Sequence, residues 1–124
     1  MASEDVQVLV VTADTTWRDQ CTTILVNSGC QVNTESQGTQ ALNALRKRRY
    51  DLVLLDDSLP DFGLIEMSLT IRDVAAAHPQ LLVGGDDIDR YQRFWQQFDA
   101  YYVGTKQGVA SKALDAVHHL ERSG

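Results

Sequence analysis

The sequence predicts a doubly wound α/β domain, in which five parallel strands form a sheet with helices on both faces. Short apolar runs alternate with helical stretches along the whole chain of 124 residues. One of these runs, Leu52 to Leu55, has no polar residue, which is typical of a strand buried on both faces at the centre of a parallel sheet. Because crossovers between parallel strands are right-handed, the alternation places helices on both sides.

The first half of the chain predicts two strand–helix units. Val6–Val11 is an apolar strand, and the turn Thr12–Thr15 offers Asp or Thr as the N-cap of the helix that follows. That helix ends before Ser28-Gly29, which is a typical helix stop. Cys30–Glu35 is the second strand, and Gln37–Arg48 is the second helix.

The second half of the chain predicts three more units. The expected strands are Asp51–Asp56, Gln80–Val83 and Tyr101–Val103. The expected helices are Leu64–Ala77, which His78-Pro79 ends, then Ile88–Phe98 and Gly108–Arg122. The natural strand order for five such units is the flavodoxin-like 2-1-3-4-5, which brings the ends of the first and third strands side by side.

Length and composition indicate a single globular domain over residues 1–124. The net charge of −6 argues against a nucleic-acid binder that works by neutralising phosphates. No apolar stretch is long enough to span a membrane, and the N-terminus lacks the features of a signal peptide. We therefore expect a cytoplasmic protein that does not bind membranes, with Cys21 and Cys30 as reduced thiols.

The stretch that carries most chemistry is Tyr50–Gly63, where the buried strand ends in Asp56 and Asp57. In open α/β sheets, ligands and chemistry gather at the carboxyl ends of the strands. Asp56 is therefore the candidate functional carboxylate, whereas Asp57 is expected to face solvent or to cap the loop. Asp14 follows the neighbouring first strand, where the roles of helix N-cap and metal ligand are both open to it.

The element order and these motifs resemble the receiver domain of response regulators, the CheY-like family of two-component phosphorelays. The resemblance runs from about Val6 to Leu120. DLVLLD, followed by Ser58-Leu59-Pro60, is similar to the phosphoacceptor strand and loop, and the stretch Asp99–Val103 resembles the aromatic-bearing fifth strand. Together these pieces are fairly specific, whereas each of them alone is weak.

The resemblance implies a signalling domain rather than an enzyme. It implies that Asp56 accepts a phosphoryl group from a partner histidine kinase. It also implies a Mg²⁺ ion, held by Asp14, Asp56 and the main-chain carbonyl of Ser58, because Mg²⁺ prefers hard oxygen ligands. We expect this metal site to be weak.

Departures from the family pattern are as informative as the match. The family usually carries two acidic residues directly after the first strand, and here these positions are Thr12 and Ala13. The hydroxyl residue that ends the fourth strand is Gly84, and the lysine that ends the fifth is Gly104. Lys106 lies two residues further on, where only a shifted loop would bring it back. Charge-assisted hydrogen bonds contribute about 1.5–3 kcal/mol each, so losing two would remove most of the switching energy.

The sequence therefore favours an atypical receiver, or pseudo-receiver, that acts through protein–protein interaction with weak or no phosphorylation. Its candidate switch and partner surface comprises Gly84, Trp95, Tyr101 and Lys106, within a region crowded with aromatic residues. Simple packing of these aromatic side chains is the alternative. We expect a histidine kinase or another signalling protein as the partner, and the same surface is the candidate homodimer interface.

Two other functions remain open. The first is a working, Mg²⁺-dependent phosphoacceptor that a histidine kinase phosphorylates on Asp56. The second is a small flavodoxin-like binder of a nucleotide or flavin, which would need a phosphate-binding loop after the first strand. That loop, Thr12–Trp17, has hydroxyls and amides but no glycine, so we rank this function last.

Overall fold

The computed structural model describes residues 5–123, with side chains for residues 5–120. Its five parallel strands have the order β2-β1-β3-β4-β5, which confirms the predicted topology. The strands are β1 (Gln7–Val11), β2 (Gln31–Glu35), β3 (Leu52–Asp56), β4 (Gln80–Gly84) and β5 (Tyr102–Gly104). The helices are α1 (Thr15–Asn27), α2 (Gly38–Lys47), α3 (Leu64–Val74), α4 (Gln92–Gln97) and α5 (Lys106–Ser123).

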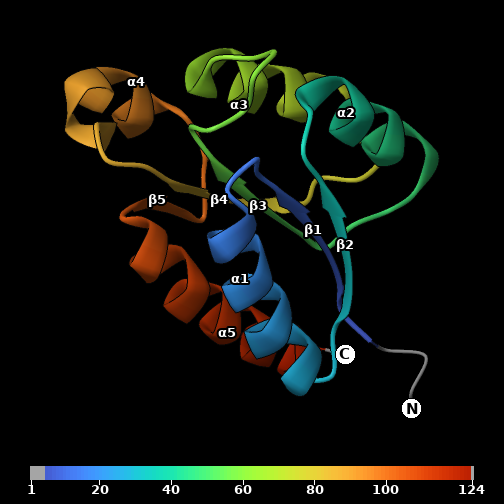
Figure 1. Ribbon diagram of the computed structural model, residues 1–124. Helices are drawn as coiled ribbons and strands as arrows, with labels where there is room; N and C mark the ends of the chain where they lie inside the picture. Colours follow the sequence, from blue (N-terminus) through green and yellow to red (C-terminus); the bar gives the residue numbers. More distant parts are fainter. Residues whose placement is uncertain (1–4, 124) are drawn as a thin grey trace.

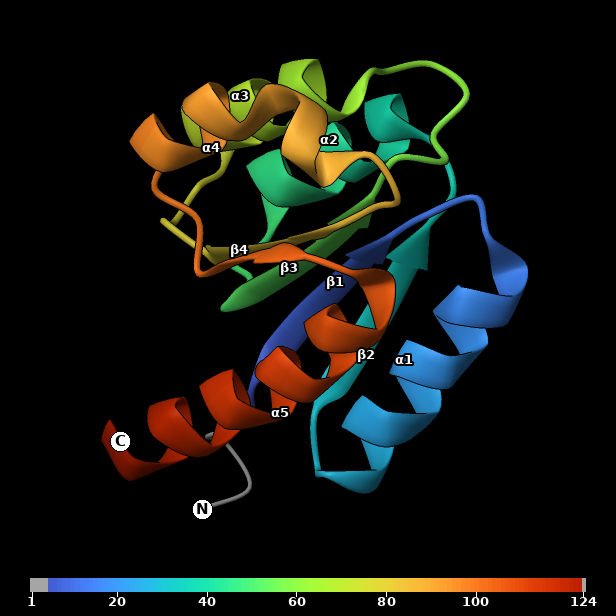
Figure 2. The same cartoon turned by 90° about the vertical axis from the view of Figure 1, so that its left-hand side faces the viewer.

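Helices cover both faces of the sheet (Figure 1). Figure 2 shows α1 and α5 together on one face, and α2, α3 and α4 on the other. Successive residues of a strand point to opposite faces, so each central strand supplies both cores. Val8, Val10 and Leu54 pack under α1 and α5, whereas Leu9 and Leu55 pack under the opposite layer. All of β3 is buried, as its unbroken apolar run predicts.

Three helices differ by more than one residue from the predicted bounds. Helix α5 begins at Lys106 rather than Gly108, because the hydroxyl of Thr105 accepts a hydrogen bond from the N–H of Gly108 and caps the helix there. Helix α3 ends at Val74, and the chain then turns so that the N–H of Ala76 donates to a carbonyl of α2. The predicted helix 88–98 is a 3₁₀ turn, η2 (Ile88–Tyr91), followed by the short α4.

Strand register brings the candidate site together. β1 and β3 are neighbours, with Val11 opposite Leu55, so the residues that follow β1 lie beside Asp56. On its other side, Asp56 pairs with Gly84 of β4. Among the described residues, no helix is both long enough and apolar enough to cross a membrane.

Candidate functional site

The Asp56 carboxylate lies at the carboxyl end of β3 and is only 1% exposed. The Thr12 hydroxyl donates to its Oδ2 at 2.7 Å, and the Ser58 hydroxyl donates to its Oδ1 at 2.7 Å. The Ser58 backbone N–H adds a longer bond of 3.3 Å to Oδ1. Both oxygens of this buried carboxylate are therefore occupied by donors, as a buried charge requires.

The two hydroxyls are themselves held in place by the loop after β1. Thr12 Oγ1 accepts from the N–H of Asp14 at 3.0 Å, and Ser58 Oγ accepts from the N–H of Ala13 at 2.8 Å. A hydroxyl carries one proton and two lone pairs, so Thr12 and Ser58 can each accept a backbone N–H and still donate to Asp56. Neither hydroxyl role was predicted, although the run of hydroxyl residues after β1 was visible in the sequence.

Lys106 reaches the site, which was expected from the sequence only if the loop after β5 were shifted. Its Nζ lies 3.1 Å from Oδ2 of Asp56 and 2.6 Å from Oδ2 of Asp14. The reason is the early start of α5, which makes Lys106 its first residue. The carbonyl of Lys106 accepts a hydrogen bond of 3.1 Å from the indole N–H of Trp17, and its ammonium lies 5.3 Å from the centre of that ring.

Asp14 caps α1, as predicted, and also pairs with Lys106. Its Oδ1 accepts from the N–H of Trp17 at 3.1 Å, while Oδ2 faces the ammonium. The hydrogen bond from Lys106, helped by that from Trp17, holds the pKa of Asp14 below its ordinary value of 3.8. Burial opposes the charge of Lys106, but its bonds to Asp14 and Asp56 outweigh burial and raise its pKa above 10.5.

These residues fit a Mg²⁺ ion poorly. Mg²⁺ requires several hard oxygen ligands in a near-octahedral arrangement. Here only Asp14 and Asp56 bring carboxylates, and both face the ammonium of Lys106. Among the side chains that the structure describes, those of residues 5–120, no group of three or more His, Cys, Asp or Glu is placed to hold a metal. Ser58 meets Asp56 through its hydroxyl and N–H, and its expected role through the main-chain carbonyl stays a prediction.

Gly84 is buried beneath the start of α5, so it does not form part of an outer surface. A Cβ at this position would lie 2.8 Å from Cγ2 of Val109 and 3.0 Å from Cα of Lys106. The close approach of α5 thus explains why a glycine replaces a larger residue here. The same approach lets Lys106 reach Asp56.

The predicted aromatic surface divides into a packed part and an exposed part. Trp95 is half-buried and makes edge contacts with Phe94 and Phe98, at ring-centre distances of 4.8 Å and 6.0 Å. Tyr91 and Tyr101 are the exposed members, at 45% and 39%. The indole N–H of Trp95 is buried and has no hydrogen-bond partner among the described residues. Packing therefore accounts for Trp95, whereas the two tyrosines remain open to a partner.

Comparison with known sequences supports the same family throughout. The model of the response regulator receiver domain matches residues 8–118. The chain is 38% identical over 66 residues to the DNA-binding response regulator MtrA of Mycobacterium tuberculosis, covering 53% of this chain and 29% of that protein. It is 32% identical over 79 residues to the transcription factor SKN7 of Saccharomyces cerevisiae, covering 64% of this chain and 13% of that one. The chain thus spans less than a third of these relatives.

Solved structures share the fold. A CheY-like receiver domain from Methanospirillum hungatei superposes with a TM-score of 0.79 at 17% identity, over 97% of this chain and 99% of that one. One from Methylobacillus flagellatus gives 0.76 at 21% identity, over 91% and 98%. A response regulator from Burkholderia pseudomallei, solved with a phosphorylated aspartic acid and a calcium ion, gives 0.75 at 16% identity, over 91% and 66%.

Proposed function

Because the chain belongs to the response-regulator receiver family, we propose that it is an atypical receiver of two-component signalling, working through protein–protein contacts with weak or no phosphorylation. The observation that supports this proposal is the position of the Lys106 ammonium, whose nitrogen lies 3.1 Å from Oδ2 of Asp56. The ammonium of Lys106 lies between Asp14 and Asp56 and leaves these carboxylates one negative charge in excess. A divalent ion would have to compete with this ammonium for both carboxylates.

Thr12 strengthens the case. It stands where the family usually has an acidic residue, and its hydroxyl donates to Asp56 instead of offering a negative charge to a cation. Without Mg²⁺, the charge that develops on transferring oxygens has less compensation, so phosphorylation should be slow. Receiver domains interact with histidine kinases and other signalling proteins. The partner and homodimer surface that we propose is the region of α4, β5 and α5, with the exposed Tyr91 and Tyr101 as anchors.

A second candidate function is a working phosphoacceptor. The contact of 3.1 Å between Lys106 and Asp56 favours it, because a lysine ammonium beside the acceptor can also bind a phosphoryl oxygen. In this case Asp56 would receive the phosphoryl group from a kinase, and Asp14, Asp56 and the carbonyl of Ser58 would hold a weakly bound Mg²⁺.

The test is to incubate the protein with acetyl phosphate and excess Mg²⁺ and to measure its intact mass. Variants Asp56→Asn and Thr12→Asp run alongside, with Thr16→Asp on the exposed side of α1 as the matched control. We expect little adduct on the parent and on Thr16→Asp. Thr12→Asp adds a carboxylate beside Asp56, so we expect it to gain the phosphoryl mass at least about tenfold faster. Rapid, stoichiometric adduct on the parent that Asp56→Asn abolishes would reject the atypical receiver in favour of the second candidate.

A further inference from the structure

Trp17, in the first turn of α1, contacts both members of the ion pair between Asp14 and Lys106. Its backbone N–H donates to Oδ1 of Asp14 at 3.1 Å, and its indole N–H donates to the carbonyl of Lys106 at 3.1 Å. The centre of its ring lies 5.3 Å from Nζ of Lys106. One residue thus links the loop after β1 to the start of α5, beside the carboxylate of Asp56.

The indole of Trp17 is fixed by the core. It is 5% exposed and belongs to the same buried cluster as Val109 and Ala113 of α5. A cation over the face of an aromatic ring is attracted by the ring quadrupole, and the attraction is stronger where water is excluded. The side chain of Lys106 is 20% exposed, so its contact with the ring is largely shielded from solvent.

The ion pairs of Lys106 place its ammonium, but they do not by themselves hold its backbone. Nζ lies 2.6 Å from Asp14 and 3.1 Å from Asp56, at the end of a long, flexible stem. Holding such a side chain at one point costs rotamer entropy. Trp17 opposes this cost in two ways, because it binds the carbonyl from which the residue extends and also faces the ammonium.

We propose that Trp17 is a positioning residue, which holds the ammonium of Lys106 between its two carboxylate partners and so determines which cation this site accepts. With Trp17 in place, the carboxylates keep an internal monovalent cation. With the hold of Trp17 weakened, a divalent ion from solution competes better for the same oxygens. The inference rests on the proposed function, in which the ammonium opposes a divalent ion, and adds the residue that sets the balance.

The test is an NMR titration of the ¹⁵N-labelled protein with Mg²⁺, in which the backbone N–H signals of Ala13 and Ser58 report binding beside Asp56. We expect weak binding by the parent. Lys106→Met removes the ammonium and should tighten Mg²⁺ binding at least about tenfold. Trp17→Phe removes the indole N–H and offers the cation a weaker ring, so it should tighten Mg²⁺ binding about threefold or more.

The double variant distinguishes positioning from a general disturbance of the site. If Trp17 acts through Lys106, then Trp17→Phe should change the Mg²⁺ affinity of Lys106→Met by less than about twofold. A merely structural effect on the loop after β1 would change the affinity in both backgrounds.

A second measurement leaves the packing of Trp17 intact. In Trp95→Phe, where Trp17 is the remaining tryptophan of the chain, 5-fluorotryptophan can replace it biosynthetically. The fluorinated ring keeps the N–H and nearly the same shape, but it draws electron density from the ring face. It should therefore also tighten Mg²⁺ binding, relative to unlabelled Trp95→Phe.

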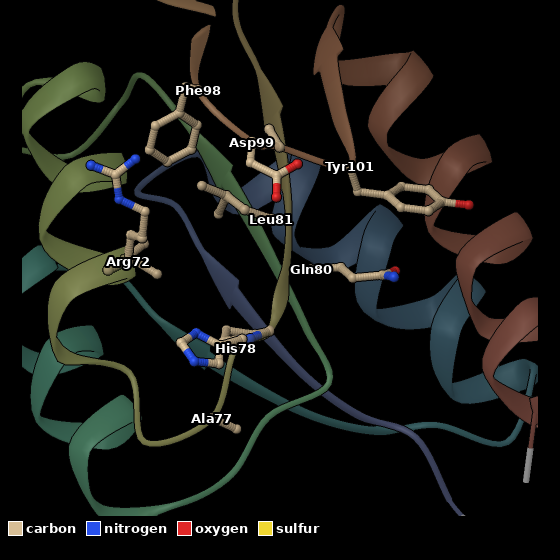
Figure 3. A pocket seen from close by; sticks show the side chains of 11 residues that line it. Arg72, Ala77, His78, Gln80, Leu81, Phe98, Asp99 and Tyr101 are labelled. Atoms are coloured by element: carbon tan, nitrogen blue, oxygen red, sulfur yellow. The ribbon is translucent and has the colours of Figure 1, made fainter.

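Two matched controls lie away from Asp56. Trp95→Phe makes the same change at the other tryptophan and should bind Mg²⁺ as the parent does. Arg72 and Phe98 form a similar contact, with the guanidinium 5.0 Å from the ring centre. They line a cavity of about 630 Å³ at the amino-terminal ends of β4 and β5, the opposite edge of the sheet from Asp56 (Figure 3). Arg72→Met removes a cation there and should leave the Mg²⁺ affinity unchanged.

The outcomes separate this inference from the proposed function. If Lys106→Met did not tighten Mg²⁺ binding, the competition that supports the proposed function would be absent, and the role of Trp17 would be rejected with it. If Lys106→Met tightened binding but neither Trp17→Phe nor the fluorinated ring did, the proposed function would stand and the role of Trp17 would be rejected. Equal effects of Trp17→Phe with and without the Lys106 ammonium would reject that role as well.

Discussion

Replacing Lys106 by methionine isolates the contribution of its ammonium to the stability of the domain. Methionine keeps most of the apolar stem and removes the charge that lies 3.1 Å from Asp56. Asp56 would keep its bonds from Thr12 and Ser58, so the carboxylate would lose one charged partner rather than all of them. The side chain of Lys106 is 20% exposed, so solvent weakens the pair only in part. We expect a loss of about 2 kcal/mol in the free energy of unfolding.

The assay is urea unfolding together with thermal melting of four proteins: the parent, Lys106→Met, Asp56→Asn and the double variant. For a chain of this size, 2 kcal/mol corresponds to a fall in melting temperature of roughly 8 °C. In the Asp56→Asn background the same lysine change should cost less, because the buried carboxylate is gone and only the more exposed pair of Lys106 with Asp14 remains. Lys112→Met, at an exposed position of α5, is the control and should change stability by less than about 0.5 kcal/mol.

The pH dependence of the free energy of unfolding gives an independent test of the stabilisation by the Lys106 ammonium. A lysine whose folded pKa is raised above 10.5 contributes stability that is complete below that value and is lost as pH rises through the raised pKa. The parent should therefore lose more stability than Lys106→Met between neutral pH and pH values above 10.5. If Lys106→Met lowered the free energy of unfolding equally in the parent and in Asp56→Asn, the ion pair between Lys106 and Asp56 would be rejected as the source of stability.

Gly84, Asp61 and Cys21 each give a further prediction about stability or reactivity. Gly84→Ser should destabilise the domain by about 1–3 kcal/mol, because its Cβ would press on Val109; equal urea midpoints would contradict this. The pKa of Asp61 is lowered by bonds from the backbone N–H groups of Gly38 and Thr39, so this stability is lost as pH falls below 3.8. Asp61→Asn should accordingly show a smaller loss on acidification in thermal melts. Burial raises the pKa of Cys21 to about 12, so iodoacetamide should label it only after unfolding, as mass mapping would show.

The sheet was predictable because its signals are local and strong. Four consecutive apolar residues in β3 identify a strand buried on both faces, and the handedness of crossovers then restricts the order of the others. Asp56 and Asp14 were predicted as site residues from their positions at the ends of β3 and β1. Their proximity required only the strand order, which the alternation of elements supplied.

Lys106 was harder to place because its role depends on where α5 begins. Gly108 suggested a later start, yet Thr105 is a good N-cap and receives the N–H of Gly108. That signal was present in the sequence and would have placed the lysine at the first turn. The capping of α2 by Asp61 is different, because the cap comes from 23 residues further along the chain and has no local pattern. Trp95 also packs against the core cluster of residues such as Met67 and Val83, and these tertiary contacts are not revealed by helical periodicity.

The first turn of α5 is tied to the Asp56 site by an ion pair, whereas the rest of the helix is held by apolar packing of residues such as Val109 and Val117. The 18 residues of α5 extend about 27 Å, and they are tied to β3 and α1 at one end through the ammonium of Lys106. If a partner or ligand drew that ammonium away from Asp56, a rotation of about 5° at the first turn would move the far end by about 2 Å, the size of helix shifts in switching proteins. A change at Asp56 would then be transmitted along α5 and would not require the hydroxyl side chain that the family usually has at the position of Gly84.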